Sequence, residues 1–182
     1  FDAAQPAPKF HPSMARLLSE GSPTKDEDPT VLRTPDGTMI VAWFSDRGGN
    51  SDIYLRSTLD GKLWSDTTRV TDDPGGDFDP SLLLDSRGTF HLVWFRWTAP
   101  SVGHIWHSTS TDGLTWNKDD EEQVTTGDDY DDWVPTIAEA PDGTLLIYFV
   151  SLKRSNNGSS ELYVVSKRAG ESDWGPVAPV TD

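Results

Sequence analysis

The sequence predicts an all-β fold made of three similar four-stranded units. The chain of 182 residues contains 15 Gly and 13 Pro with eight Trp, seven Phe and four Tyr, which is typical of many short strands joined by tight turns. A short motif recurs as Asp28-Pro29-Thr30, Asp79-Pro80-Ser81 and Val134-Pro135-Thr136, and its prolines are 51 and 55 residues apart. Units of about 50 residues with four antiparallel strands are the pattern of β-propeller blades. A sandwich of irregular hairpins is the alternative, but it does not require one order of landmarks three times.

Each unit is expected to contain four strands. The first strand follows the proline motif, and its turn carries Gly37, Gly88 or Gly143, which repeat the spacings of 51 and 55 residues. The second strand is a nearly continuous apolar run, as expected for a strand covered on both faces. The expected strands are 30–33, 39–44, 52–57 and 68–71 in the first unit, 81–84, 90–95, 104–109 and 123–126 in the second, and 136–138, 145–150, 161–166 and 178–181 in the third. No segment has a helical period, so almost no helix is expected.

The predicted organisation is a flexible segment 1–14, an extra outer strand within 15–27, and blades at 28–78, 79–133 and 134–182. Propellers close with about four to eight blades, so three blades leave two flanks open. Two explanations remain: a second copy completes a six-bladed ring, or these residues are part of a larger propeller. In the first case the strand at 15–19 would be exchanged between copies.

A turn motif follows the third strand of two blades. It reads Ser57-Thr58-Leu59-Asp60-Gly61-Lys62-Leu63-Trp64 in the first blade and Thr109-Ser110-Thr111-Asp112-Gly113-Leu114-Thr115-Trp116 in the second, and a degenerate copy lies at 169–174. The motif resembles the Asp box, or BNR repeat, of sialidase-like β-propellers. Its Asp accepts backbone N–H groups, its Gly takes a positive φ, and its Trp packs over the hairpin. Asp60, Gly61, Trp64, Asp112, Gly113 and Trp116 are therefore interpreted as structural.

The resemblance covers 15–182 and implies a six-bladed, carbohydrate-active fold whose functional cleft lies opposite the Asp-box turns. The Arg-Ile-Pro segment of catalytic sialidases does not occur in the sequence. Fold alone does not establish activity, so the site has to be argued from its own residues.

Composition excludes several classes of function. Lys and Arg number 15 against 30 Asp and Glu, a formal net charge of −15, and no segment is basic enough to follow a nucleic-acid backbone. No apolar run approaches the roughly 18–20 residues of a membrane span. The absence of cysteine excludes disulfides, thiolate metal sites and cysteine nucleophiles. The acidic, cysteine-free composition and the Ala/Pro-rich segment 1–12 favour a secreted or periplasmic protein.

The candidate site lies where the loops before the first strands meet the loops after the second strands. Because antiparallel strands alternate in direction, these loops share one end of the blades and would surround the mouth of a central channel. The candidate catalytic residues are Asp28, Asp79 and Asp132, and the candidate substrate-binding residues are Arg47, Arg96, Trp97 and Trp133. Carboxylates, arginines and aromatic rings together suit a glycan, for hydrolysis or for recognition.

Two other interpretations of these loops remain open. The carboxylates could simply form turns and solvated acidic surface, which would leave a lectin-like module or a protein-interaction scaffold. No cofactor is predicted, although calcium could bind at Asp77 and Asp79 or within 128–132, where oxygen ligands are plentiful.

Overall fold

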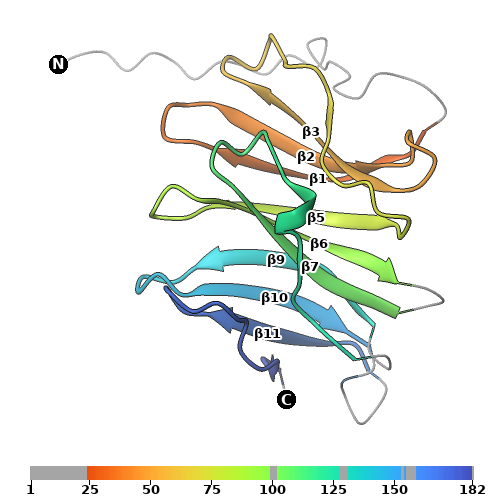
Figure 1. The fold of residues 1–182 in the computed structure, drawn as a ribbon, viewed down its shortest axis with the longest axis vertical. Helices are drawn as coiled ribbons and strands as arrows, with labels where there is room; N and C mark the ends of the chain where they lie inside the picture. Colours follow the sequence, from red (N-terminus) through yellow and green to blue (C-terminus); the bar gives the residue numbers. More distant parts are fainter. Residues whose placement is uncertain (1–23, 99–101, 128–130, 153, 155–158, 182) are drawn as a thin grey trace.

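Three four-stranded antiparallel sheets form the molecule, as predicted. The computed structural model describes residues 24–98, 102–127, 131–152, 154 and 159–181. The first sheet has the order β1 (Asp26–Arg33), β2 (Met39–Ser45), β3 (Asp52–Thr58) and β4 (Thr68–Arg69); the second has β5 (Asp77–Leu84), β6 (Phe90–Thr98), β7 (Val102–Ser110) and β8 (Glu122–Gln123); the third has β9 (Asp132–Glu139), β10 (Leu145–Ser151), β11 (Glu161–Lys167) and β12 (Ala178–Pro179). Figure 1 shows them as three successive layers.

The sheets pack face to face like blades. Side chains of β2 and β3, among them Ile40 and Phe44, pack against Leu92 and Trp94 of β6 in one core cluster. The opposite face of the second sheet contributes Val93 to a second cluster with side chains of β9, β10 and β11. Each sheet presents alternate residues of a strand to opposite neighbours, so its second strand is apolar on both faces.

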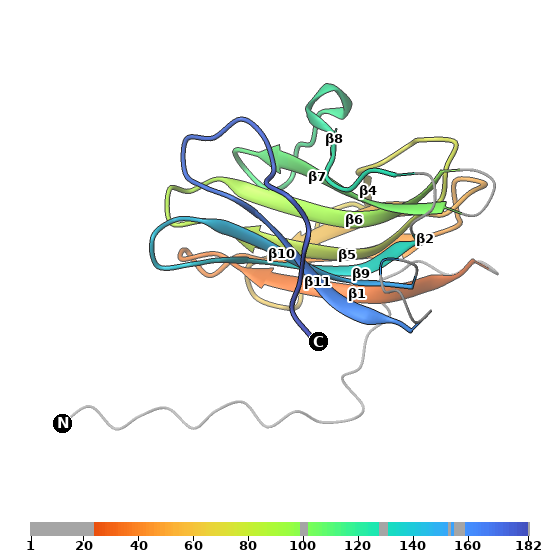
Figure 2. The ribbon, with the colours of Figure 1, turned by 90° about the horizontal axis from the view of Figure 1, so that it is seen from below.

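The first strands of the sheets are the innermost. β1 contacts β5 and β5 contacts β9, and the backbone N–H of Ile137 in β9 donates to the hydroxyl of Ser81 in β5 over 3.4 Å. Seen from below, the three strands lie close together, whereas β8 lies at the periphery (Figure 2). We call the end of the channel at which β1, β5 and β9 begin the hub mouth.

A distortion occurs at the start of every inner strand. The pairing register shifts between Glu27 and Thr30, between Phe78 and Ser81, and opposite 134–135 in β9. Proline has no N–H for the ladder, so a bulge is the expected place for it. The residue before each proline has a positive φ of 50–51°. The repeated motif therefore encodes a repeated backbone shape at the hub mouth.

The turns after β3 and β7 have the contacts expected of their Asp and Gly residues. Oδ1 of Asp60 accepts the N–H groups of Lys62 and Leu63 at 2.8 and 2.9 Å, while Oδ1 of Asp112 accepts those of Leu114 and Thr115. The N–H groups of Thr115 and Leu114 outweigh burial and lower the pKa of Asp112 to about 2. The indole N–H of Trp116 donates to the Gly113 carbonyl, and Trp64 is half-buried. The Asp60 and Asp112 carboxylates thus bind the backbone of their own turns.

Some expectations differ in extent or cannot be compared. The outer strands have two residues each instead of four, because few backbone pairs form beyond 69, 123 and 179. The inner strands begin two residues before the predicted blade boundaries. A short 3₁₀ helix, η2 (Lys118–Asp120), lies between β7 and β8. The segment 1–14 and the strand at 15–19 lie outside the described residues. No described helix is long and apolar enough to span a bilayer.

Candidate functional site

Each blade contains an aspartate–arginine pair at the hub mouth. The aspartate is the first residue of the inner strand, and the arginine lies near the end of the second strand or just after it. The pairs are Asp26–Arg47 at 2.7 Å, Asp77–Arg96 at 2.6 Å and Asp132–Arg154 at 2.6 Å. The three aspartates are spaced by 51 and 55 residues, the same spacings as the prolines. This repeated pair is a structural feature of the blade.

The pair of the second blade is the most deeply buried. Asp77 receives Nε and Nη2 of Arg96 and also the indole N–H of Trp94 at 3.0 Å. Nη2 of Arg96 also donates to Glu121 at 2.9 Å, and its guanidinium carbon lies 4.4 Å from the ring centre of Trp106. Burial raises the pKa of Asp77 in spite of these contacts. The Arg96 guanidinium is thus fully engaged by the protein itself.

Three predicted site residues, Asp132, Arg47 and Arg96, bind partners within their own blade. Asp132 is fully buried and receives both Nε and Nη2 of Arg154. It is equivalent in the repeat to Asp26 and Asp77, not to Asp28 and Asp79. Arg47 and Arg96 each bind the carboxylate of their own blade, which holds their guanidinium groups against the inner strands. None of the three is presented to solvent in the manner of Asp28.

Asp28 and Asp79 are brought together by the inner strands. Hydrogen bonding and charge from Asp28 both act on the Asp79 carboxyl group, so the two side chains lie close together. Burial, followed by the hydrogen bond and charge of Asp28, raises the pKa of Asp79 to about 6. Asp28 is exposed and Asp79 is half-buried. We call this pair, together with the Val134 N–H group, the hub site.

The third blade contributes backbone to the hub site. Val134 is the repeat equivalent of Asp28 and Asp79, and its backbone N–H acts to lower the pKa of the nearby Asp79 carboxyl group. Val134 has a φ of 50° and a side chain that is 56% exposed. A β-branched residue with this φ is a conformational outlier. Such strain is concentrated at functional sites, where the surrounding structure maintains it.

Replacing Val134 by Asn is expected to increase the free energy of unfolding by about 1 kcal/mol. Asn tolerates the left-handed conformation, has no branched Cβ, and keeps the N–H group that Asp79 accepts. The change is measured by urea denaturation. Val31→Asn is the control, because Val31 is also exposed on an inner strand but has no positive φ. An unchanged or lower stability of Val134→Asn would show that this backbone conformation stores no strain.

The two predicted aromatic site residues, Trp97 and Trp133, differ in their exposure to solvent. Trp97 is 37% exposed, and its ring packs edge-on against Phe95 at 5.1 Å. The backbone N–H of Trp97 donates to the Gly76 carbonyl. Trp133 is half-buried against the second core cluster, and its indole N–H is buried without a hydrogen-bond partner among the described residues. Trp97 is therefore the more available platform for a sugar ring.

Among the described residues, no group of three or more His, Asp or Glu side chains is arranged to hold a metal ion. Both carboxylate oxygens of Asp77 are used by Arg96. Residues 128–130 of the second predicted calcium site lie outside the described part.

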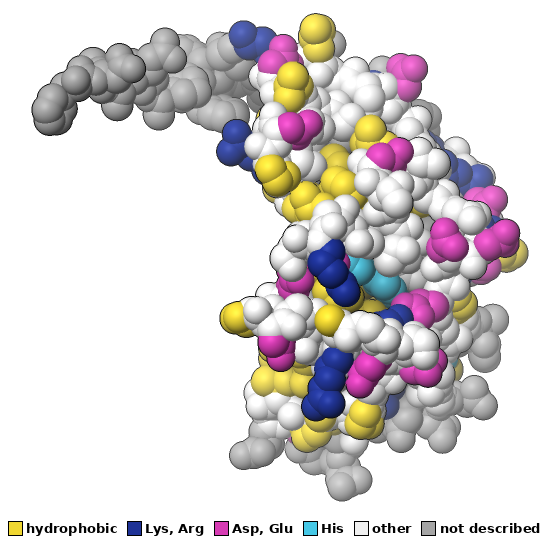
Figure 3. Space-filling model, turned by 60° about the vertical axis from the view of Figure 1, so that its left-hand side comes forward, with side chains coloured by type: hydrophobic (Ala, Val, Ile, Leu, Met, Phe, Trp, Pro, Cys, Tyr) yellow, Lys and Arg dark blue, Asp and Glu magenta, His cyan; other side chains and the backbone are white. Residues whose placement is uncertain are grey.

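Sequence reasoning missed a histidine pair far from this mouth. His91 of β6 and His107 of β7 are hydrogen-bonded to each other at the turn end of the second blade, beside a cavity of about 420 Å³. In Figure 3 histidine side chains (cyan) are just visible at mid-height, between basic and acidic side chains. The available signal was weak, because the two residues are diagonal neighbours across two strands.

Comparisons with solved structures identify the class of fold. No protein-family profile and no curated protein matches the sequence. An endo-arabinase structure from Bacteroides thetaiotaomicron is similar at a TM-score of 0.64 and 16% identity, over 85% of this chain and 61% of that one. An inulosucrase from Halalkalicoccus jeotgali bound to kestose has a TM-score of 0.62 and 14% identity, over 90% and 54%. A family 117 glycoside hydrolase produced by Zobellia galactanivorans has a TM-score of 0.63 and 12% identity, over 86% and 57%.

The fold is a partial β-propeller. All three blades correspond to those of glycoside hydrolase propellers, and the chain spans a little over half the length of these neighbours. A sialidase is not among the structures compared above, so the broader propeller class is what the likeness supports.

Proposed function

We propose that the chain binds an uncharged glycan at the hub site. The observation that carries the proposal is the Asp28–Asp79 pair, two neighbouring carboxyl groups on positive-φ backbone at the hub mouth, in which the pKa of Asp79 is raised to about 6. When Asp79 is protonated the pair offers one O–H donor and several acceptor oxygens, which matches neighbouring sugar hydroxyls. Trp97 lies on the same end of the second blade and would stack on the apolar face of a ring.

Charge favours an uncharged ligand over an acidic one. The arginines at or just after the ends of the second strands, Arg47, Arg96 and Arg154, each bind an aspartate of their own blade. An acidic sugar would meet the carboxyls of the hub site and a chain with a formal net charge of −15. A sialidase-like preference for sialate would need freed guanidinium groups. The neighbours named as an arabinase and an inulosucrase bound to kestose agree with a neutral glycan.

Glycoside hydrolysis is a second candidate, favoured by the pKa of about 6 at Asp79, which suits a general acid near neutral pH. Hydrolysis needs two carboxyl groups about 5–5.5 Å or about 6.5–9.5 Å apart, on either side of the scissile bond. Asp28 lies close enough to raise the pKa of Asp79 through hydrogen bonding and charge, so the two carboxyl groups are too close together to take these two roles. They would act as one acid–base unit, and the opposing carboxyl would come from outside the pair.

Asp79→Asn tests the proposal by calorimetric titration with neutral oligosaccharides selected on a glycan array. The variant is expected to lose at least tenfold in affinity, because an amide cannot ionise and has one acceptor oxygen where the carboxylate has two. Asp36→Asn, in the exposed β1–β2 turn, is the matched control and should bind like the wild type. Equal binding by Asp79→Asn, or no neutral glycan bound by the wild type, contradicts the proposal. Turnover of an aryl glycoside panel separates hydrolysis from recognition.

The same variant is expected to change the pH dependence of stability. The folded-state pKa of Asp79 is raised, so its stabilising proton is present at low pH and is lost as pH rises through about 6. Between pH 5 and 8 the wild type should therefore lose about 1 kcal/mol more than Asp79→Asn, after allowance for solvent screening. Thermal unfolding across this range measures the difference. Parallel curves would show that no proton is held at the hub site.

The open flank of the third blade supports a proposal about assembly. Leu146, Tyr148 and Val150 alternate with buried residues on β10 and are half-buried. The equivalent faces of the first two blades are covered by the next blade. We propose that a second copy covers this face and completes six blades. Light scattering is expected to show a dimer for the wild type and a monomer for Tyr148→Glu.

A secreted or periplasmic location, the sialidase-like relationship and the Asp-box assignment also remain predictions.

A further inference from the structure

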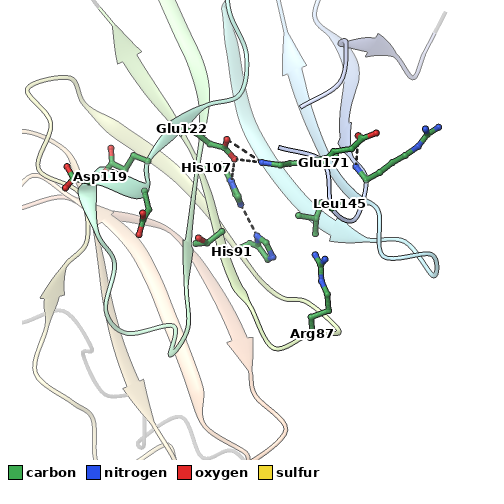
Figure 4. A pocket seen from close by; sticks show the side chains of 13 residues that line it. Arg87, His91, His107, Asp119, Glu122, Leu145 and Glu171 are labelled. Atoms are coloured by element: carbon green, nitrogen blue, oxygen red, sulfur yellow. Dashed lines mark hydrogen bonds and ion pairs between the residues drawn. The ribbon is translucent and has the colours of Figure 1, made fainter. Parts of the chain in front are cut away.

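Four side chains form a line through the second blade, away from the hub site. Oδ2 of Asp85 lies 3.4 Å from Nε2 of His91, Nδ1 of His91 lies 2.9 Å from Nε2 of His107, and Nδ1 of His107 lies 2.7 Å from Oε1 of Glu122. Figure 4 shows the two rings pointing toward each other, with Glu122 beyond them. Both histidines are 3% exposed. Bulk water therefore does not compete for these nitrogen atoms.

Counting protons limits the states of this line. Glu122 can only accept when ionised, so Nδ1 of His107 carries a proton, and Nε2 of His107 is then the acceptor in a neutral ring. The contact of 2.9 Å therefore requires the proton on Nδ1 of His91. In the neutral state both donors point toward Glu122, and Nε2 of His91 is bare. Its long distance to Asp85 agrees with this state.

The carboxylates at the two ends are held in their ionised form. Burial acts to raise the pKa of Glu122, but hydrogen bonds from His107, Trp174 and Lys167 outweigh it and lower the pKa to about 2. Burial likewise opposes ionisation of Asp85, and the N–H groups of Thr89 and Arg87 outweigh it and lower its pKa. Neither end therefore takes up a proton at mildly acidic pH.

The line ends on the junction between two blades. Oε1 of Glu122 accepts from His107 in the second blade and, from the third, from Nζ of Lys167 at 3.1 Å and the indole N–H of Trp174 at 2.9 Å. Trp174 also packs edge-on against His107 at 5.3 Å. Glu122 therefore connects the histidine pair of the second blade to Lys167 and Trp174 of the third.

We propose that Asp85, His91, His107 and Glu122 form a proton-directed lock, which holds the third blade on the second at neutral pH and loosens on acidification. The neutral line has every donor directed toward Glu122. A proton added to His91 places a cation in a buried site beside a second ring and near Arg87.

The charged surroundings of the rings come from three elements. Asp85 and Arg87 face them from the β5–β6 turn, Glu122 from β8 and Lys167 from β11. The remaining charged groups lining the cavity are Asp119, Asp120, Glu121, Arg168 and Glu171. Burial, then the charge of His107, lowers the pKa of His91, and this outweighs the attraction of Asp85. The unfolded chain thus takes up the proton first, so the lock loses stability as pH falls below about 6.5.

Nitrogen NMR of the wild type tests the lock directly. At pH 7.5 we expect a coupling across the hydrogen bond between Nδ1 of His91 and Nε2 of His107, with His107 protonated at Nδ1. His107 protonated at Nε2, or no coupling between the rings, would overturn the proposal.

Hydrogen exchange tests the consequence for the third blade. After correction for intrinsic exchange, β11 amides of the wild type are expected to lose at least tenfold in protection between pH 7.5 and pH 5, while β2 amides change less than threefold. His91→Gln keeps a donor toward His107 but does not titrate, so its β11 loss should stay below threefold. The other described buried histidine, His104, is unchanged in this comparison. Equal losses in both proteins, or a parallel loss in β2, would refute the lock.

Discussion

Asp77→Ala is expected to lower the free energy of unfolding by about 3–5 kcal/mol. The variant leaves the Arg96 guanidinium buried with only Glu121 and the more distant Asp73 to balance its charge, and it removes the acceptor of the Trp94 indole N–H. Removing one partner of a buried pair costs far more than the pair itself contributes, because the remaining charge is neither solvated nor balanced. Urea denaturation followed by tryptophan fluorescence measures the loss.

The repeat supplies a matched control in Asp26→Ala. The Asp26–Arg47 pair occupies the same position in the first blade, but its side chains are 18% and 21% exposed. Water can solvate Arg47 when its partner is removed, so the expected loss is only about 1 kcal/mol. Equal losses in the two variants would mean that burial does not set the cost, and the structural interpretation of the buried pair would then be wrong.

The blade repeat could be predicted because its signals are local. A proline at a bulge, a glycine in a turn and an apolar second strand each report backbone conformation within a few residues. Their common spacing then gave three sheets of four strands, which the structure confirms. The outer strands were overestimated, because their length depends on pairing partners and not on local preference.

The candidate site was harder to predict, because the partner of each aspartate and arginine depends on contacts in three dimensions and not on local sequence. In the third blade the aspartate nearest the proline is Asp132, yet the residue equivalent to Asp28 and Asp79 is Val134, two positions later. Counting from the proline instead of the aspartate would have revealed this offset. The pairing of Arg47 and Arg96 with their own blades, and the contact of His91 with His107, depend on side-chain geometry across strands.

Gly113→Ala is expected to lower the free energy of unfolding by about 3 kcal/mol or more, and Gly61→Ala by about 1–2 kcal/mol. Both glycines have a φ of 70° in equivalent turns, so both variants incur the cost of a left-handed conformation. A Cβ on Gly61 would lie 3.7 Å from the nearest atom, in Met39, which is ordinary contact. A Cβ on Gly113 would lie 2.6 Å from the Phe90 ring and 2.8 Å from Ile40, both in the core between the first two blades.

The difference between the two alanine variants therefore measures packing alone, since the backbone term is common to both. Overpacking of a well-filled core costs about 1–3 kcal/mol. If both variants lose the same stability by urea denaturation, the core beside Gly113 can move aside. The second turn would then act only as a hairpin end, and it would not help to hold the first two blades together.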